Sequence, residues 1–133
     1  MLTMFRTIGA TGVGAGTSVV PWKEWGHFLE EFHKAHKGWL TLFETTDHET
    51  RESARTGESV LESIVFDTED ELHPRINVTV RNGNKIFKHI LYMPSRVVWH
   101  TSDGGLREAL EIETVNTTTV ARFRPQSGPL PAI

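Results

Sequence analysis

Hydrophobic residues recur at intervals of three and four after Pro21, which predicts an amphipathic helix of about four turns. Pro21 suits the first helical position, and Gly38 suits the left-handed residue that follows a helix. A stripe this aromatic must be buried, so we expect the rest of the chain to pack against it. The stripe comprises Trp22, Trp25, Phe28, Leu29, Phe32 and His36.

Beyond the helix the hydrophobic positions alternate with a period of two, which predicts β-strands. The alternation is clearest where Ile76, Val78 and Val80 share one face, whereas residues 47–58 lack periodicity and are interpreted as a long loop. Because consecutive strands usually pair, we expect an α+β fold that is mostly antiparallel β. One N-terminal helix would be followed by a six- to seven-stranded meander or small open barrel. The predicted strands include residues 39–46, 59–66, 75–81 and 96–101.

Turn signals set the expected register of these strands. Asn82-Gly83 is typical of a two-residue hairpin, which would place Val78 opposite Phe87. A further turn at Asn116-Thr117 would close the last hairpin and pair Ile112 with Ala121. These pairings keep one hydrophobic face throughout, which favours them over shifted registers.

His89, His100 and Glu108 form one cross-strand row in this register and are the candidate metal ligands. A turn at Pro94-Ser95 places His89 opposite His100, and a three-residue connection within residues 102–105 places Glu108 on the other side of His100. Two imidazoles and one carboxylate can bind zinc or ferrous iron. The alternative is a core-packed His89, with Glu108 balancing the charge of His100, and a one-residue slip would separate the three. We therefore assign no cofactor.

The face opposite the expected core carries an apolar patch, because the same turn places Ile90 opposite Trp99 and Tyr92 opposite Val97. Exposed apolar patches mark interaction surfaces, and either the helix stripe or a second subunit could cover this one. We therefore expect a non-enzymatic protein–protein interaction module, forming a homo-oligomer and binding an unknown protein partner. The predicted interaction patch comprises Trp22, Trp25, Ile90, Tyr92, Val97 and Trp99.

Other function classes find less support in the residues. The chain has no Gly-x-Ser-x-Gly elbow and no aspartate spaced to orient a histidine beside a serine, so no catalytic residue is assigned. A metal- or small-ligand-binding protein that uses the His/His/Glu row is the first alternative. A small-barrel single-stranded RNA binder is the second, because its aromatic residues could stack on bases. The aromatic residues concerned are Trp22, Trp25, Tyr92 and Trp99.

The amino-acid composition of the chain narrows the choice among these function classes. The 133 residues suit one domain with its own core, and the net charge of -3 provides no basic field for nucleic acid. The absence of cysteine excludes thiol nucleophiles, thiolate zinc sites and iron–sulfur clusters, and it fits a reducing compartment. The longest uncharged run, Thr7 to Trp22, is too short and too rich in glycine to cross a bilayer. We therefore expect a cytoplasmic protein without membrane contact.

Three segments follow from these patterns: a flexible glycine-rich arm at residues 1–20, a helix-plus-sheet domain at residues 21–124 and a proline-rich tail at residues 125–133. The arm contains glycines that invite comparison with phosphate-binding loops. However, no lysine separates Gly16 from Thr17, and the helix starts only after Pro21. An arm is therefore the simpler interpretation.

Two sets of residues in this chain form a familiar pattern. The first half contributes Glu24-Trp25, Phe28-Leu29, Phe32, His36 and Gly38-Trp39. The second half contributes His89-Ile90, Pro94, Arg96-Val97, Leu110-Glu111-Ile112 and the run from Thr118 to Arg124. Together these residues resemble an uncharacterised family of short bacterial proteins defined only as a domain of unknown function. The resemblance covers about residues 20–124 and implies no activity, substrate or catalytic residue.

Overall fold

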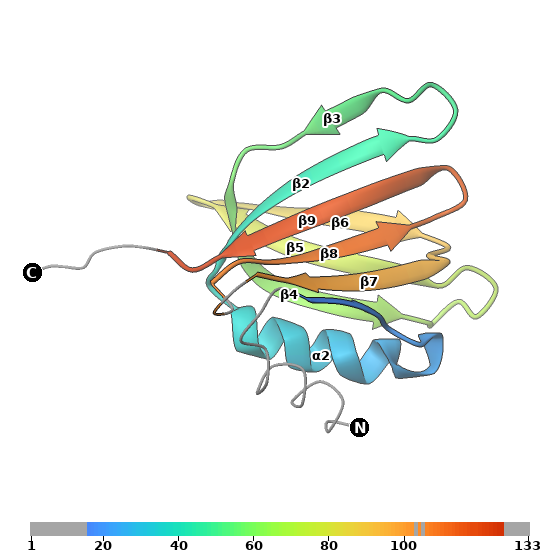
Figure 1. The fold of residues 1–133 in the computed structure, drawn as a ribbon, viewed down its shortest axis with the longest axis horizontal. Helices are drawn as coiled ribbons and strands as arrows, with labels where there is room; N and C mark the ends of the chain where they lie inside the picture. The colour runs from blue at the N-terminus through green and yellow to red at the C-terminus, as the bar shows by residue number, and fades with distance from the viewer. Residues whose placement is uncertain (1–15, 103, 105, 127–133) are drawn as a thin grey trace, which may run out of the picture.

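The computed structural model describes residues 16–102, 104 and 106–126, which form a mostly antiparallel sheet and one α-helix (Figure 1). Within these residues the chain forms nine strands, a short 3-10 helix and the α-helix. None of the helices described is long and apolar enough to cross a membrane. The elements are β1 (Gly16–Val19), η1 (Trp22–Glu24), α2 (Trp25–His36), β2 (Leu40–Asp47), β3 (Ser53–Arg55), β4 (Ser59–Asp67), β5 (Arg75–Asn82), β6 (Lys85–Tyr92), β7 (Arg96–Thr101), β8 (Glu108–Glu113) and β9 (Thr117–Arg124).

The predicted helix consists of two parts. Pro21, at φ −60°, leads into the single 3-10 turn of η1, and α2 begins at Trp25. Gly38 has φ +92°, which confirms it as the left-handed residue that ends the helix. The apolar stripe is buried from Trp25 to His36, whereas Trp22 is 67% exposed and lies outside the core.

The strands run in the order β1-β7-β8-β9-β2-β4-β5-β6, with β3 beside β2. β4 joins β2 through only two residue pairs, Leu40–Val60 and Thr41–Ser59, and β3 occupies the rest of that edge of β2. The sheet therefore divides at this corner. In Figure 1, β2, β3, β7, β8 and β9 form one layer in front, while β4, β5 and β6 lie behind it. β1 and β6 are the ends of the strand order, so the sheet is not closed.

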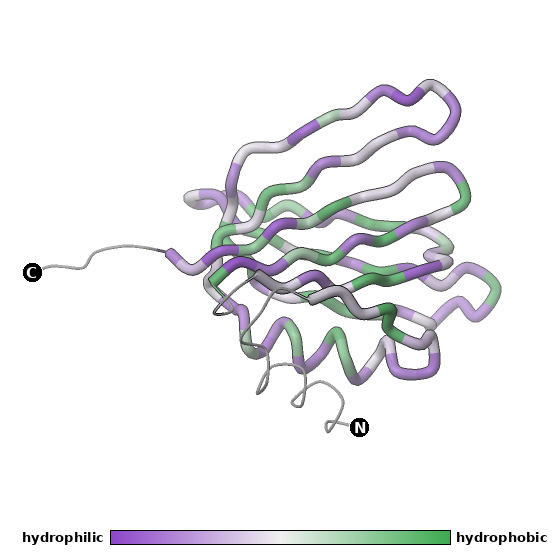
Figure 2. Tube along the Cα trace, viewed as in Figure 1, coloured by the Kyte–Doolittle hydropathy of each residue, from purple (hydrophilic) through white to green (hydrophobic). Residues whose placement is uncertain are grey.

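The hydrophobic core lies between these two layers and α2. Phe28 contacts Trp99 of β7 and Phe32 contacts Phe123 of β9, with ring centroids 5.5 and 5.1 Å apart. Alternate residues of each strand therefore point toward the core, which we call the inner face, and the others point to the outer face. In Figure 2, hydrophobic and hydrophilic residues alternate along the strands.

The mostly antiparallel α+β class is confirmed, but the number of strands is larger than predicted. The additional strands β1 and β3 have the sequences GTSV and SAR, which are too short and polar to show alternation. β1 lies in the segment predicted as a flexible arm, and β3 lies in the predicted loop. Residues 1–15 of that arm and residues 127–133 of the predicted tail lie outside the described residues.

The sheet is also not a meander of sequential hairpins. β2 pairs with β9 along its whole length, from Leu40–Arg124 to Asp47–Thr117. β6 and β7 do not pair, and five strands separate them in the sheet order. The predicted hairpin at Pro94-Ser95 is wrong because this connection crosses between the layers. Ser95 N–H donates to the Glu113 carbonyl of β8 at 2.7 Å.

In two other hairpins the side chains lie on the predicted side of the sheet, although the strand register differs from the predicted one. β5 and β6 turn at Gly83-Asn84, and Gly83 has φ +64° at the first central position, where a type II′ turn requires glycine. Val78 therefore lies opposite His89 instead of Phe87. In the last hairpin Ile112 lies opposite Thr119 instead of Ala121. Each shift is two residues, which preserves the side of the sheet that each side chain faces.

Candidate functional site

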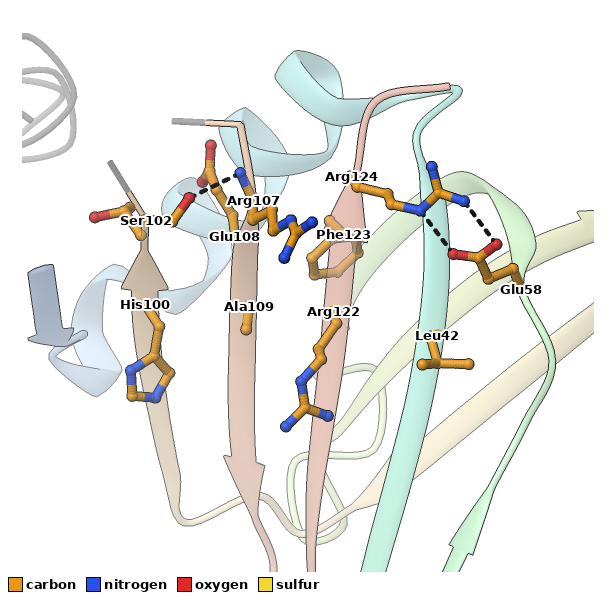
Figure 3. A pocket seen from close by; sticks show the side chains of 11 residues that line it. Leu42, Glu58, His100, Ser102, Arg107, Glu108, Ala109, Arg122, Phe123 and Arg124 are labelled. Carbon is orange, nitrogen blue, oxygen red and sulfur yellow. Dashed lines mark hydrogen bonds and ion pairs between the residues drawn. The ribbon is translucent and has the colours of Figure 1, made fainter. Parts of the chain in front are cut away.

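A groove of about 390 Å³ opens on the outer face where β7, β8, β9 and β2 lie side by side (Figure 3). Its floor follows from the register: Ala109 lies between His100 and Arg122, and Arg122 lies beside Leu42. The short side chain of Ala109 leaves space among longer neighbours. We call this space the β8–β9 groove; it is lined by Leu42, Glu58, His100, Thr101, Ser102, Arg107, Glu108, Ala109, Arg122, Phe123 and Arg124.

The three arginines of the groove differ in their partners. Arg124 donates two hydrogen bonds to Glu58, at 2.8 and 2.9 Å, and these bonds hold the pKa of Glu58 below its ordinary value. Arg122 donates to Glu44 at 3.1 Å. For Arg107 the described residues show a backbone N–H bond to Ser102 Oγ but no ion pair or hydrogen bond of the guanidinium. Among the described residues, Arg107 is therefore the arginine of the groove whose guanidinium has no partner.

His100 lies on the wall of this groove with both ring nitrogens occupied. Its Nδ1 is 3.2 Å from Thr17 Oγ1 of β1, and its Nε2 is 3.0 Å from Glu111 Oε1 of β8. All three side chains lie on the outer face. The contacts hold His100 in place and leave neither nitrogen directed at a shared metal position.

Glu108 belongs to the inner face, where it joins the end of α2 to the sheet. Its Oε2 is 2.9 Å from His36 Nε2, and its Oε1 accepts a hydrogen bond from Trp99 Nε1 at 2.8 Å. The other nitrogen of His36, Nδ1, donates to the Phe32 carbonyl at 2.7 Å. His36 also stacks on Phe32, with centroids 4.0 Å apart. This buried network satisfies every polar atom that the helix end brings into the core.

His89, the third residue of the predicted metal row, lies apart from His100 and Glu108. It lies on the inner face of β6 and stacks on Phe43 of β2, with centroids 3.9 Å apart, and burial lowers its pKa. The β7–β8 register differs from the prediction by one residue, so Ala109 lies opposite His100 and Glu108 turns to the other face. His89, His100 and Glu108 therefore do not form a row. Among the described residues, no group of three His, Cys, Asp or Glu residues could hold a metal ion.

The predicted interaction patch is likewise divided by the fold. Trp25, Val97 and Trp99 are buried in the core, whereas Ile90 and Tyr92 lie exposed on β6. Buried Trp25 and Trp99 are also unavailable to stack on bases, as the RNA-binding alternative requires. Trp22 and Trp25 line a second cavity of about 600 Å³ at the start of the helix, together with Phe66, Pro74 and Pro94.

Strand β6 is the most exposed hydrophobic element of the sheet. Phe87 is 46% exposed and Tyr92 is 53% exposed, and Ile86, Ile90 and Met93 are also exposed. β5 pairs with one edge of β6, and no other described strand pairs with the opposite edge. Of the devices that discourage edge pairing, the strand contains neither a proline nor a bulge but does carry two lysines, Lys85 and Lys88.

Sequence reasoning did not find Arg107 or the groove. The alternation of Arg122 and Arg124 with buried Phe123 does indicate two arginines on one outer face. Arg107 lies just before β8, in the connection whose length was misjudged, so no periodicity reports its position. Comparison of the chain with protein-family models, curated proteins and solved structures found no match.

Proposed function

We propose that this protein is a non-enzymatic interaction module that forms a homodimer through strand β6. The observation that carries the proposal is the edge of β6 with which no described strand pairs. Most side chains of this eight-residue strand are exposed, and only Lys85 and Lys88 are charged. An exposed, uninterrupted hydrophobic edge is a template for pairing with another strand. We therefore propose the edge of β6 as the surface through which the expected homo-oligomer forms.

The backbone groups available on this edge follow from the hydrogen bonding of β6 with β5. Met93 N–H donates to the Pro74 carbonyl at 2.8 Å, which identifies this pair as hydrogen-bonded. Because bonded and non-bonded pairs alternate along antiparallel strands, Phe87, His89 and Leu91 direct their backbone groups to β5. The intervening residues direct theirs outward. These residues are Ile86, Lys88, Ile90 and Tyr92.

The sequence of β6 is close to self-complementary about His89, which favours a second copy as the occupant. Antiparallel pairing centred on His89 places Ile86 opposite Tyr92 of the second copy and Lys88 opposite Ile90 of the second copy. It also brings exposed Phe87 against Leu91 of the second copy. All four outward-facing residues are then paired, giving roughly eight backbone hydrogen bonds, two for each facing pair.

Dimer registers centred on neighbouring residues of β6 are less stable. A register centred on Lys88 would place two lysines directly opposite each other, and like charges in that position destabilise a sheet. A register centred on Ile90 would extend Ile86 beyond the end of the partner strand, toward Pro94, which has no N–H to donate. The two-fold axis is therefore expected at His89, as an isologous dimer requires.

Sedimentation velocity of the whole chain and of the variant Ile90→Pro tests this proposal. The Ile90 N–H points away from β5, so proline removes an edge donor while the β5–β6 hydrogen bonds remain. We expect the wild type to sediment as a dimer of the 15.0 kDa chain and Ile90→Pro as a monomer.

Val65→Lys is the matched control, because Val65 is an exposed hydrophobic residue on the outer face of β4, away from the β6 edge. This variant should remain dimeric, and circular dichroism should show that both variants fold. A monomeric wild type, or a folded Ile90→Pro that stays dimeric, would overturn the proposal.

A further inference from the structure

The β8–β9 groove combines surplus positive charge with a hydrophobic floor. Glu44 is shared by two arginines, with Arg122 at 3.1 Å and Arg55 at 3.6 Å, and Arg107 has no anionic partner among the described residues. Arg124 is neutralised by Glu58. The groove lining itself therefore carries three arginines against two glutamates, and Arg107 can take an anion without losing an existing pair.

The arrangement of the side chains also fits an anion. Figure 3 shows the guanidinium group of Arg107 over the space between β8 and β9 and that of Arg122 farther along β9, with Ala109 on the neighbouring strand β8. The backbone of Arg107 is fixed by two hydrogen bonds to Ser102: Arg107 N–H donates to Ser102 Oγ at 3.1 Å, and Ser102 N–H donates to the Arg107 carbonyl at 3.0 Å. The planar fork of each guanidinium can donate two parallel hydrogen bonds to a carboxylate.

The other residues that line the groove indicate what kind of anion would fit. Leu42 and Ala109 contribute a hydrophobic surface on the outer face. Glu58 and Glu108 also line the groove, so its net positive charge is smaller than its three arginines alone would give and suits a singly charged anion better than a doubly charged one. The volume of about 390 Å³ lies within the range of about 300–1,000 Å³ typical of small-molecule sites. The lining therefore favours one negative charge attached to a compact hydrophobic body.

From this combination we infer that the β8–β9 groove binds a small monocarboxylate with a hydrophobic tail, held by Arg107 and Arg122 above Ala109. The tail lies on Leu42 and Ala109. This site is independent of the proposed dimer, because β6 is at the opposite end of the strand order from β7 and β8.

Titration of the isotope-labelled protein with hexanoate, followed by amide NMR, tests the inference. We expect saturable shifts at Arg107, Ala109 and Arg122, and no comparable saturable shifts with 1-hexanol or inorganic phosphate. Arg107→Gln should weaken hexanoate binding about tenfold or more, because it removes a charge-assisted, bidentate partner. Ala109→Leu should abolish binding by filling the floor while every charge remains.

Arg96→Gln is the control, because Arg96 is an exposed arginine at the far end of β7, paired with Glu113 at 3.9 Å. It should bind hexanoate like the wild type. No saturable hexanoate binding, equal affinity for phosphate, or unchanged affinity in folded Arg107→Gln and Ala109→Leu would each overturn the inference. Ile90→Pro should retain hexanoate binding, so failure of the dimer and failure of the groove are distinguishable.

Discussion

Removal of the Glu108 carboxylate should destabilise the fold far more than removal of a neighbouring glutamate. Glu108 accepts from Trp99 at 2.8 Å and contacts His36 at 2.9 Å, and the side chains of His36 and Glu108 are only 5% and 11% exposed. The variant Glu108→Ala removes the Glu108 contact of His36 and the Glu108 hydrogen bond of Trp99. Breaking a buried pair by removing one member costs about 3–5 kcal/mol, because the other member loses both solvent and partner.

Glu111→Ala supplies the comparison on the same strand. Glu111 contacts His100 at 3.0 Å, but those side chains are 31% and 37% exposed and remain partly solvated. Loss of an exposed pair of this kind costs about 0–1 kcal/mol. The two variants therefore remove the same chemical group from opposite faces of β8, one from the core and one from the surface.

Urea unfolding monitored by tryptophan fluorescence measures both free energies, with similar m-values as the check that the unfolded states are comparable. The double variant His36→Phe/Glu108→Leu should recover part of the stability lost in Glu108→Ala, because Phe can stack on Phe32 and no polar group remains on either residue, although the hydrogen bond from Trp99 to residue 108 is still lost. Equal losses in Glu108→Ala and Glu111→Ala would refute the reasoning.

Two further predictions concern single residues. Burial lowers the pKa of His89 below 6.5, so the unfolded chain binds a proton that the folded chain does not; the unfolding free energy should therefore fall as pH decreases below 6.5, and His89→Phe should reduce that slope in urea titrations at several pH values. A steeper slope in His89→Phe would contradict this assignment. Gly38→Ala should cost about 1–2 kcal/mol, because φ is +92° there while the space around the added Cβ is open, and calorimetry should show a lower Tm. An unchanged Tm would show that the helix end does not require this conformation.

The sequence predicted the helix well because both of its signals are local. The three- and four-residue spacing identified the buried stripe, and Gly38 identified the end. Trp22 was the exception, because the first turn is a 3-10 helix that directs this side chain into solvent. Periodicity reports which residues share a face only while the helix geometry stays constant.

The strand positions were also predictable, but their partners were not. Alternation identified the buried face of β5 from Ile76 to Val80, and this face is correct. The β2–β9 pairing joins residues as distant as Leu40 and Arg124, and no turn signal reports such a contact. The connection after Tyr92 resembled a hairpin turn, yet it crosses between layers.

The candidate site depended on the least predictable quantity, the exact length of a turn. The error of one residue between β7 and β8 moved Glu108 from the side of His100 to the core beside His36. The errors of two residues in the neighbouring hairpins left every side chain on its predicted face. Because side chains alternate, an odd shift destroys a cross-strand site, whereas an even shift only changes partners.

The most direct test of the β6 dimer is amide hydrogen exchange measured at low and high protein concentration. The account predicts that the outward-facing amides of Ile86, Lys88, Ile90 and Tyr92 exchange rapidly in dilute protein and become protected as the concentration rises. The amides of Phe87, His89 and Leu91, which face β5, should be protected throughout. If the outward-facing amides exchange rapidly at every concentration, strand β6 does not pair with a second copy and the central claim is contradicted.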